Sequence, residues 1–238
     1  MFTRKLSKQT KLMLLFVIVP LYLFCGSLIA SAVIKFLVLN FSLVVDENIL
    51  TVYLNFGLDL SFVFIVFAIM KDDLIVQWKD FFKDIKDNLF HACVIGTVLI
   101  YAAGLIGSII SALLGMQVDS QNQQLIETLT VSKPLMMILT TVILAPIFEE
   151  IFFRGMIFSW LYEIHPVVGH IASAFLFGFV HIMNAVLAGN MGEWMQIFSY
   201  MFMGGALSYL YEKRNNIFVP ILSHALNNLI SVLLIFIL

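Results

Sequence analysis

Long apolar runs follow one another along almost the whole chain, and this feature restricts the fold more than any other. A helix needs about 20 apolar residues to cross the ~30 Å hydrocarbon core of a membrane. Roughly seven stretches reach that length, and they cover residues 12–39, 49–70, 89–115, 134–158, 168–188, 194–211 and 217–238. Because backbone polar groups in lipid must be hydrogen-bonded internally, these runs predict an all-α, polytopic transmembrane helical bundle.

The composition separates this chain from soluble and nucleic-acid-binding proteins. Its 238 residues are 61% hydrophobic and 12% charged, with a mean hydropathy of +1.02. Soluble domains are about 45–50% apolar and about 25% charged. A formal net charge of −2 gives no basic face for nucleic acid. We find no repeat and no second soluble domain, so residues 1–238 are expected to form a single integral membrane domain in a lipid bilayer.

The distribution of lysine and arginine predicts the orientation of the chain. Cytoplasmic loops of membrane proteins are enriched in these residues. A cytoplasmic N-terminus leaves only Lys35 and Lys133 on the outer side. It places on the inner side Arg4, Lys5, Lys8, Lys11, Lys71, Lys79, Lys83, Lys86, Lys213 and Arg214. We therefore expect an integral protein with a cytoplasmic N-terminus, and the short loops of this compact chain indicate a bacterial cell membrane.

Three shorter features concern packing and connections. Residues 71–88 alternate apolar and charged positions at helical spacing, which predicts a structural helix with one apolar face along the cytoplasmic interface. Residues 117–127 are expected to form a solvated outer loop. Small residues repeat every four positions in the third run and predict close helix packing; they are Ala103, Gly107, Ser111 and Gly115.

Charged residues interrupt the fourth apolar run, which extends from Pro134 to Trp160. Glu149, Glu150 and Arg154 lie within six residues of one another. Each ionised group near the centre of a membrane costs roughly 2.5–3.5 kcal/mol on insertion scales. Such residues pair with one another, face a watery cavity or take part in chemistry.

Helix geometry assigns different directions to these side chains. Glu150 and Arg154 are four residues apart with the acid first, which favours an ion pair. Glu149 is turned about 100° from its neighbour and is expected to face a cavity. Pro146 removes a backbone donor and, by α-helical counting, frees the carbonyl of Val142. The alternative is a buried structural salt bridge beside one protonated acid.

Two histidines lie on later apolar runs. Phe177 precedes His181 by four residues, and His224 precedes Asn228 by four, with Asn227 as a competing choice. A lone histidine in an apolar helix is more often a satisfied polar residue than a catalyst. Two of them on separate helices, at a membrane depth similar to that of the acidic pair, favour a shared site.

Together the motifs EExxxR, FxxxH and HxxxN resemble the CPBP family of intramembrane proteases. This family comprises the type II CAAX prenyl endopeptidases and the bacterial bacteriocin-processing or immunity (Abi) proteins. The resemblance covers roughly residues 134–238, which would form the catalytic core. Members commonly have about eight spans, so we expect about seven to eight helices.

The resemblance implies cleavage of a peptide bond by a glutamate-activated water. Glu149 would be the general base, and His181 would hold or polarise the water. His224 and Asn228 would stabilise the oxyanion. The supporting or substrate-binding residues would be Glu150, Arg154 and Phe177, with Arg154 able to bind a substrate carboxylate. A carboxylate in a low dielectric is also a stronger base, which agrees with this assignment.

Metal dependence is a separate question. One glutamate and two histidines (Glu149, His181 and His224) form a ligand set that suits zinc with an open position. The chain has no HExxH motif, and the site can activate water directly. We therefore expect no obligatory cofactor and keep zinc as the alternative.

The leading hypothesis is an intramembrane endopeptidase. Because prenylated CAAX proteins are essentially eukaryotic, its substrate is expected to be a membrane-associated bacteriocin, leader or signalling peptide. The alternative is a non-catalytic bacteriocin self-immunity or regulatory protein that binds a peptide or a membrane partner. A small proton-relay transporter is a third interpretation, but the sequence shows no inverted repeat.

Overall fold

The computed structural model describes residues 7–22, 32–33, 35–36, 38–40, 46–114 and 120–237. Within these ranges the chain is helical and contains no β-strand, which confirms the all-α prediction. Residues 23–31, 34 and 37 of the predicted first span, residues 12–39, lie outside the described residues, as does Gly115 of the small-residue stripe.

The helices of the first half lead up to a long central helix. They are α1 (Lys8–Met13), η1 (Leu14–Ile18), α3 (Glu47–Lys83), α4 (Ile85–Phe90), η3 (His91–Ile95), α5 (Gly96–Leu113) and α6 (Gln121–Ser132). The central helix has five successive parts, α7 (Pro134–Ile138), η4 (Leu139–Leu144), α8 (Ala145–Glu150), η5 (Ile151–Phe158) and α9 (Ser159–Tyr162). Here η4 and η5 are π-helical, so the backbone register changes on both sides of α8.

The last part of the chain contributes α10 (Pro166–Leu187), η6 (Met191–Met195), α11 (Gln196–Arg214) and α12 (Phe218–Ile235). Five helices of the described residues are long and apolar enough to cross a membrane. They are Glu47–Lys83, Ile85–Leu113, Pro134–Tyr162, Pro166–Leu187 and Phe218–Ile235, and each matches one predicted span. The chain is an integral membrane protein, although α11, expected as a further span, is not among the five.

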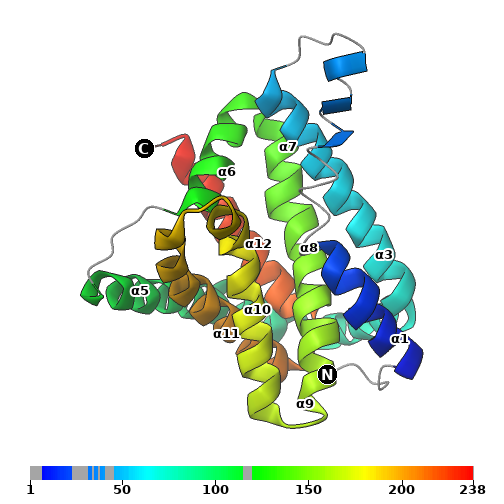
Figure 1. Ribbon diagram of the computed structural model, residues 1–238. Coiled ribbons are helices and arrows are strands. Elements are labelled where there is room, and N and C mark those ends of the chain that lie inside the picture. The colour runs from blue at the N-terminus through cyan, green and yellow to red at the C-terminus, as the bar shows by residue number, and fades with distance from the viewer. Residues whose placement is uncertain are drawn as a thin grey trace.

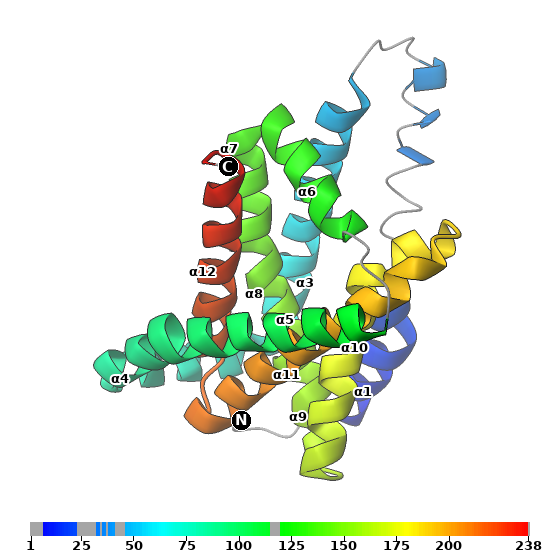
Figure 2. The same cartoon turned by 90° about the vertical axis from the view of Figure 1, so that its left-hand side faces the viewer.

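The helices cross rather than forming one parallel bundle. α3, the central helix and α12 run side by side, whereas α5 runs across them (Figures 1 and 2). α11 packs along both α10 and α5. The contact with α5 is close because of the predicted small-residue stripe: a Cβ on Gly107 would lie 2.4 Å from Ser199 Cα. Ala103 and Ser111 are buried at the same face, and Ser111 donates a hydrogen bond to the carbonyl of Met195 at 2.8 Å.

The predicted helix over residues 71–88 is present, but most of it is the C-terminal part of α3, which continues without a break to Lys83. The second predicted connection is wrong. The expected outer loop is largely helical, since α6 begins at Gln121. The N-terminus of α6 is capped by Ser120, whose side-chain hydroxyl accepts a hydrogen bond from the amide of Gln123 at 3.3 Å. A serine followed three residues later by glutamine is a capping pattern that the loop assignment overlooked.

The hydrophobic core surrounds the central helix. All eight residues of η5 are buried, and aromatic rings pack along its faces. Phe148 and Phe152 stack with centroids 5.4 Å apart, and Phe153 meets Phe177 of α10 edge to face at 5.4 Å. This packing fixes the position of the charged residues that the central helix carries.

Polar contacts join α3 and α4 to the ends of α11 and α12. Gln77 of α3 accepts the amide of Ile217 at 2.6 Å through its Oε1, and its carbonyl accepts the side chain of Asn216 at 2.7 Å. Arg214 pairs with Asp84 and Asp87. These contacts fix the ends of helices α11 and α12, which line the cleft around Glu149.

Candidate active site

The change of backbone register beside α8 creates one wall of the site. The Ala145 amide donates to the carbonyl of Thr140, five residues back, and the next residue, Pro146, has no N–H. The carbonyl of Thr141 therefore receives no hydrogen bond from the amide four residues later (Ala145) or five residues later (Pro146). The side chain of Asn228 donates a hydrogen bond to it instead, at 2.8 Å. α-helical counting predicted a freed carbonyl at Val142. The carbonyl that a side chain binds in the structure is that of Thr141, one residue earlier, in the π-helical segment η4. Such segments often occur at functional sites.

The predicted ion pair is confirmed. Glu150 Oε1 accepts a hydrogen bond from Arg154 at 2.9 Å, and both side chains are fully buried. Arg154 also donates to the carbonyl of Gly204 at 2.8 Å and lies 4.6 Å over the ring of Phe177. Neither Glu150 nor Arg154 lines the cleft. The suggested contact of Arg154 with a substrate carboxylate therefore does not match this geometry, because its guanidinium is bound inside the protein.

Glu149 points in a different direction from Glu150, as predicted. Its side chain lines the cleft. Its Oε1 lies 3.5 Å from the hydroxyl of Tyr22, and its Oε2 lies 4.0 Å from Nε2 of His224. Oε2 is buried and has no hydrogen-bond partner among the residues that the structure describes. A buried carboxylate oxygen of this kind is available to a water or a substrate.

His224 is oriented by the second glutamate. Its Nδ1 lies 2.9 Å from Glu150 Oε1, the same oxygen that accepts a hydrogen bond from Arg154. Since a carboxylate accepts, Nδ1 carries the proton and Nε2 is directed toward Glu149 and the cleft. Glu150 thus fixes the ring of His224 as well as the guanidinium of Arg154.

His181 is oriented by its own helix. Its Nδ1 donates to the carbonyl of Phe177 at 2.7 Å, which leaves Nε2 as the free ring nitrogen. The ring stacks on Tyr200 of α11, with centroids 4.5 Å apart and 23° between the planes. Phe177 lies 4.6 Å from the ring of His181 and 5.7 Å from that of His224, so it contacts both histidines.

Both candidate asparagines reach the cleft. Asn228 is held at two points, since it donates to Thr141 and accepts from Asn227 at 3.2 Å. Each amide nitrogen carries a second hydrogen that these bonds do not use. Asn227 and Asn228 therefore both remain candidates for the oxyanion donor.

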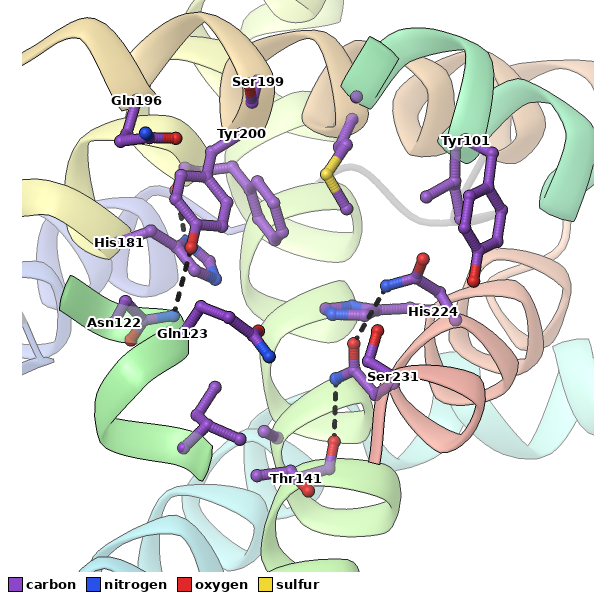
Figure 3. A pocket seen from close by; sticks show the side chains of 18 of the residues that line it. Tyr101, Asn122, Gln123, Thr141, His181, Gln196, Ser199, Tyr200, His224 and Ser231 are labelled. Atoms are coloured by element: carbon purple, nitrogen blue, oxygen red, sulfur yellow. Dashed lines mark hydrogen bonds between the residues drawn. The ribbon is translucent and has the colours of Figure 1, made fainter. Parts of the chain in front are cut away.

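A single cleft of about 540 Å³ brings the predicted residues together. It is lined by Glu149, Phe177, His181, His224, Asn227 and Asn228, together with side chains from α5, α6 and α11. Figure 3 shows His181 and His224 on opposite sides of the opening, with Gln123 of α6 projecting between them in this view.

Several residues of the site were not found from the sequence. Tyr200 and α6 belong to it because Tyr200 bonds to Ser120 at 2.8 Å, and the amide of Gln121 donates to the buried Glu193 at 2.8 Å. Only the capping pattern at Ser120 could have indicated the helix. No sequence pattern marks Tyr22, or Asp59 of α3, which interacts electrostatically with Glu149.

The three proposed zinc ligands do not converge into a metal site. Among the described residues, no group of three His, Cys, Asp or Glu side chains is placed to hold a metal ion. Glu149 approaches His224, but His181 is held against the Phe177 carbonyl and the Tyr200 ring. We therefore assign no step to a metal, and the expectation of a metal-independent site stays a prediction.

Comparison with known proteins identifies the segment that carries this site. Residues 131–230 match the model of the family described as type II CAAX prenyl endopeptidase Rce1-like. The chain is also 30% identical over 138 residues to a Bacillus subtilis (strain 168) protein named "Putative membrane peptidase YdiL". This alignment covers 58% of the chain and 52% of the relative, so the chain spans about half the length of that relative. No solved structure matches. The resemblance inferred from the three motifs is thus confirmed: residues 131–230, which include Glu149, His181, His224 and Asn228, are similar to the Rce1-like type II CAAX prenyl endopeptidases.

Proposed function

We propose that this protein is an intramembrane endopeptidase that cleaves a membrane-associated peptide or protein with a water activated by Glu149. The observation that carries the proposal is the environment of Glu149 Oε2. This oxygen is buried at the cleft, has no hydrogen-bond partner among the described residues, and lies 4.0 Å from a histidine nitrogen. A separation of this size is one that a single water can bridge.

The first step is attack by that water. Glu149 takes one proton from the water, and the resulting hydroxide adds to the carbonyl carbon of the peptide bond. His181 presents its free Nε2 within electrostatic range of Glu149 and helps to hold the water. Tyr22 fixes the other oxygen of the glutamate.

The tetrahedral intermediate carries a negative oxygen that needs donors. The cleft offers the side-chain amides of Asn227 and Asn228 and, when protonated, Nε2–H of His224. Donors aimed in advance at such an oxyanion are worth about 2.7–4 kcal/mol each when removed. Collapse then breaks the C–N bond, and the proton on Glu149 passes to the leaving amine. The products are a carboxylic acid and an amine.

The expected substrate is a bacteriocin, leader or signalling peptide precursor at a bacterial cell membrane, with the N-terminus of the enzyme in the cytoplasm. The name of the B. subtilis relative supports the membrane peptidase class. The uneven distribution of lysine and arginine supports the orientation.

The direct test replaces Glu149 by Gln, which keeps the size of the side chain but cannot act as a base. We expect membranes with the wild-type chain to release peptide fragments, measured by mass spectrometry, that are absent with Glu149→Gln. Glu47→Gln, at the exposed start of α3, is the matched control and should behave as wild type. If Glu149→Gln is inserted equally and the cellular function persists, the protein is a non-catalytic immunity or regulatory protein.

A second prediction concerns the metal. Because the proposed ligands do not converge, cleavage should continue in the presence of a strong zinc chelator such as 1,10-phenanthroline. The measurement is the initial rate of fragment release with and without chelator. Loss of activity that added zinc restores would replace the metal-free mechanism by a zinc-dependent one.

A further inference from the structure

The cleft around Glu149 is polar but contains few charges. Its charged or readily protonated lining residues are Glu149, His181 and His224, and no lysine or arginine of the described chain lines it. Five lining side chains are amides from three separate helices, namely Asn122 and Gln123 of α6, Gln196 of α11, and Asn227 and Asn228 of α12. Serine and tyrosine hydroxyls occupy much of the remaining polar wall.

Arg154 of the central helix cannot supply the missing positive charge. Arg154 is fully buried behind the cleft, where it is bound by Glu150 and the Gly204 carbonyl. Among the described residues, a free peptide carboxylate in the cleft would therefore meet no lysine or arginine, and it would approach the carboxylate of Glu149. Burying an unpaired charge is costly, and two like charges in a low dielectric repel strongly.

The amides suit a different ligand group. A side-chain amide carries both donors and acceptors, as a peptide group does. The Nε2 of Gln123 donates a hydrogen bond to Glu127 at 3.0 Å, which leaves the Oε1 of this cleft-lining residue available as an acceptor. A peptide segment that enters a membrane protein must have its backbone N–H and C=O groups satisfied there, and this wall offers both kinds of partner.

We propose that the cleft binds an internal, uncharged stretch of peptide through its backbone amides and discriminates against a free C-terminal carboxylate close to the cleaved bond. This inference rests on the proposed function and specifies the substrate class of the same site. Specificity of this kind comes from the unfavourable placement of the wrong group as well as from contacts to the right one.

The test compares two pools of N-acetylated hexapeptides with the same randomised sequences of Ala, Ser, Leu, Ile and Phe. One pool ends in a carboxamide and the other in a free carboxylate. Both are added to the full-length protein in liposomes of neutral lipid, and products are quantified by mass spectrometry. We expect kcat/KM to be at least about tenfold higher for the carboxamide pool, the effect of one unpaired charged group.

A cation introduced at the wall should reverse this preference. Ser231 lines the cleft on the α12 side (Figure 3). Ser231→Lys should raise cleavage of the free-carboxylate pool about tenfold, whereas Ser231→Met, of similar length and uncharged, should not.

The outcomes separate this inference from the proposed function. Equal cleavage of both pools, or faster cleavage of the free-carboxylate pool, that disappears in Glu149→Gln would overturn the inference and leave the protease function standing. Cleavage of neither pool by the wild-type chain, with no fragments released in membranes, would overturn both.

Discussion

Glu149 and Glu150 are neighbours in the chain, but their surroundings give them different chemistry. Glu150 is fully buried and accepts hydrogen bonds from both Arg154 and His224, so its charge is neutralised inside the protein. Glu149 lines the cleft with one oxygen directed at His224 and the other at Tyr22. The helical turn of about 100° between consecutive residues is sufficient to separate a buried, paired carboxylate from one that lines the cleft.

The contact of Tyr22 with Glu149 gives a prediction at this scale. The Tyr22 ring packs edge to face on Phe148 at 4.7 Å and Phe152 at 5.3 Å, so Tyr22→Phe should fold normally. Loss of the hydroxyl removes one hydrogen bond to Glu149, the proposed general base, and we expect kcat to fall about three- to tenfold with KM unchanged.

Kinetics of peptide cleavage by the purified variant would measure this effect. An increase in KM at constant kcat would mean that Tyr22 acts on substrate binding instead of on Glu149. Tyr53→Phe is a suitable control, because Tyr53 is exposed on α3.

At the scale of elements, the cleft depends on the crossing of α5 over α11. Gly107 makes this crossing possible, since a Cβ there would lie 2.4 Å from Ser199 Cα and 2.5 Å from Ser199 N. Ser199 lines the cleft one residue before Tyr200, which stacks on His181. Close approach of the two backbones thus places part of the site.

Gly107→Ala should therefore destabilise the protein, because backbone atoms must move to accommodate the methyl group. Overpacking of this kind costs typically about 1–3 kcal/mol. The measurement is Tm in detergent, and Gly104→Ala is the matched control, since the nearest atom to its added Cβ would be Met203 Sδ at 3.9 Å. Equal Tm values for the two variants would contradict a close α5–α11 contact.

For the whole molecule, the stability at acid pH should depend on a junction of three helices. Glu212 lies near the end of α11 and outside the five candidate spans. Its carboxylate accepts a hydrogen bond from the Tyr162 hydroxyl of α9 at 2.6 Å and lies 2.9 Å from Nε2 of His170 of α10. The Tyr162 hydroxyl, and to a lesser extent His170, holds the pKa of Glu212 below its usual value of 4.5, although partial burial opposes this shift.

A carboxylate whose pKa is lower in the folded state stabilises the protein above its unfolded pKa, and this contribution is lost as the pH falls through the folded pKa. We therefore expect Tm to decrease between about pH 5 and about pH 3, and to decrease less in Glu212→Gln. The comparison is a set of thermal unfolding curves in detergent across this pH range. An identical acid-side decrease in the variant would show that Glu212 does not contribute.

The sequence by itself determined the class of fold and indicated the candidate residues Glu149, His181 and His224. Long apolar runs permit only helices in a membrane, and charged groups within such runs must be paired or functional. The four-residue spacing of Glu150 and Arg154 determined their ion pair, because residues at this spacing lie on one helical face. These properties depend on local spacing, so they could be predicted without knowledge of the partners.

Only the tertiary structure decided which surfaces meet. Spacing along one helix could not show that His224 and Arg154 share Glu150, that α6 covers the cleft as a helix, or that Tyr22 reaches Glu149. Each of these contacts joins segments that are distant in the chain. Their formation depends on the crossing of α5 and α11 and on the π-helical register around α8, which arise from packing between helices and are not encoded in the period of any single run.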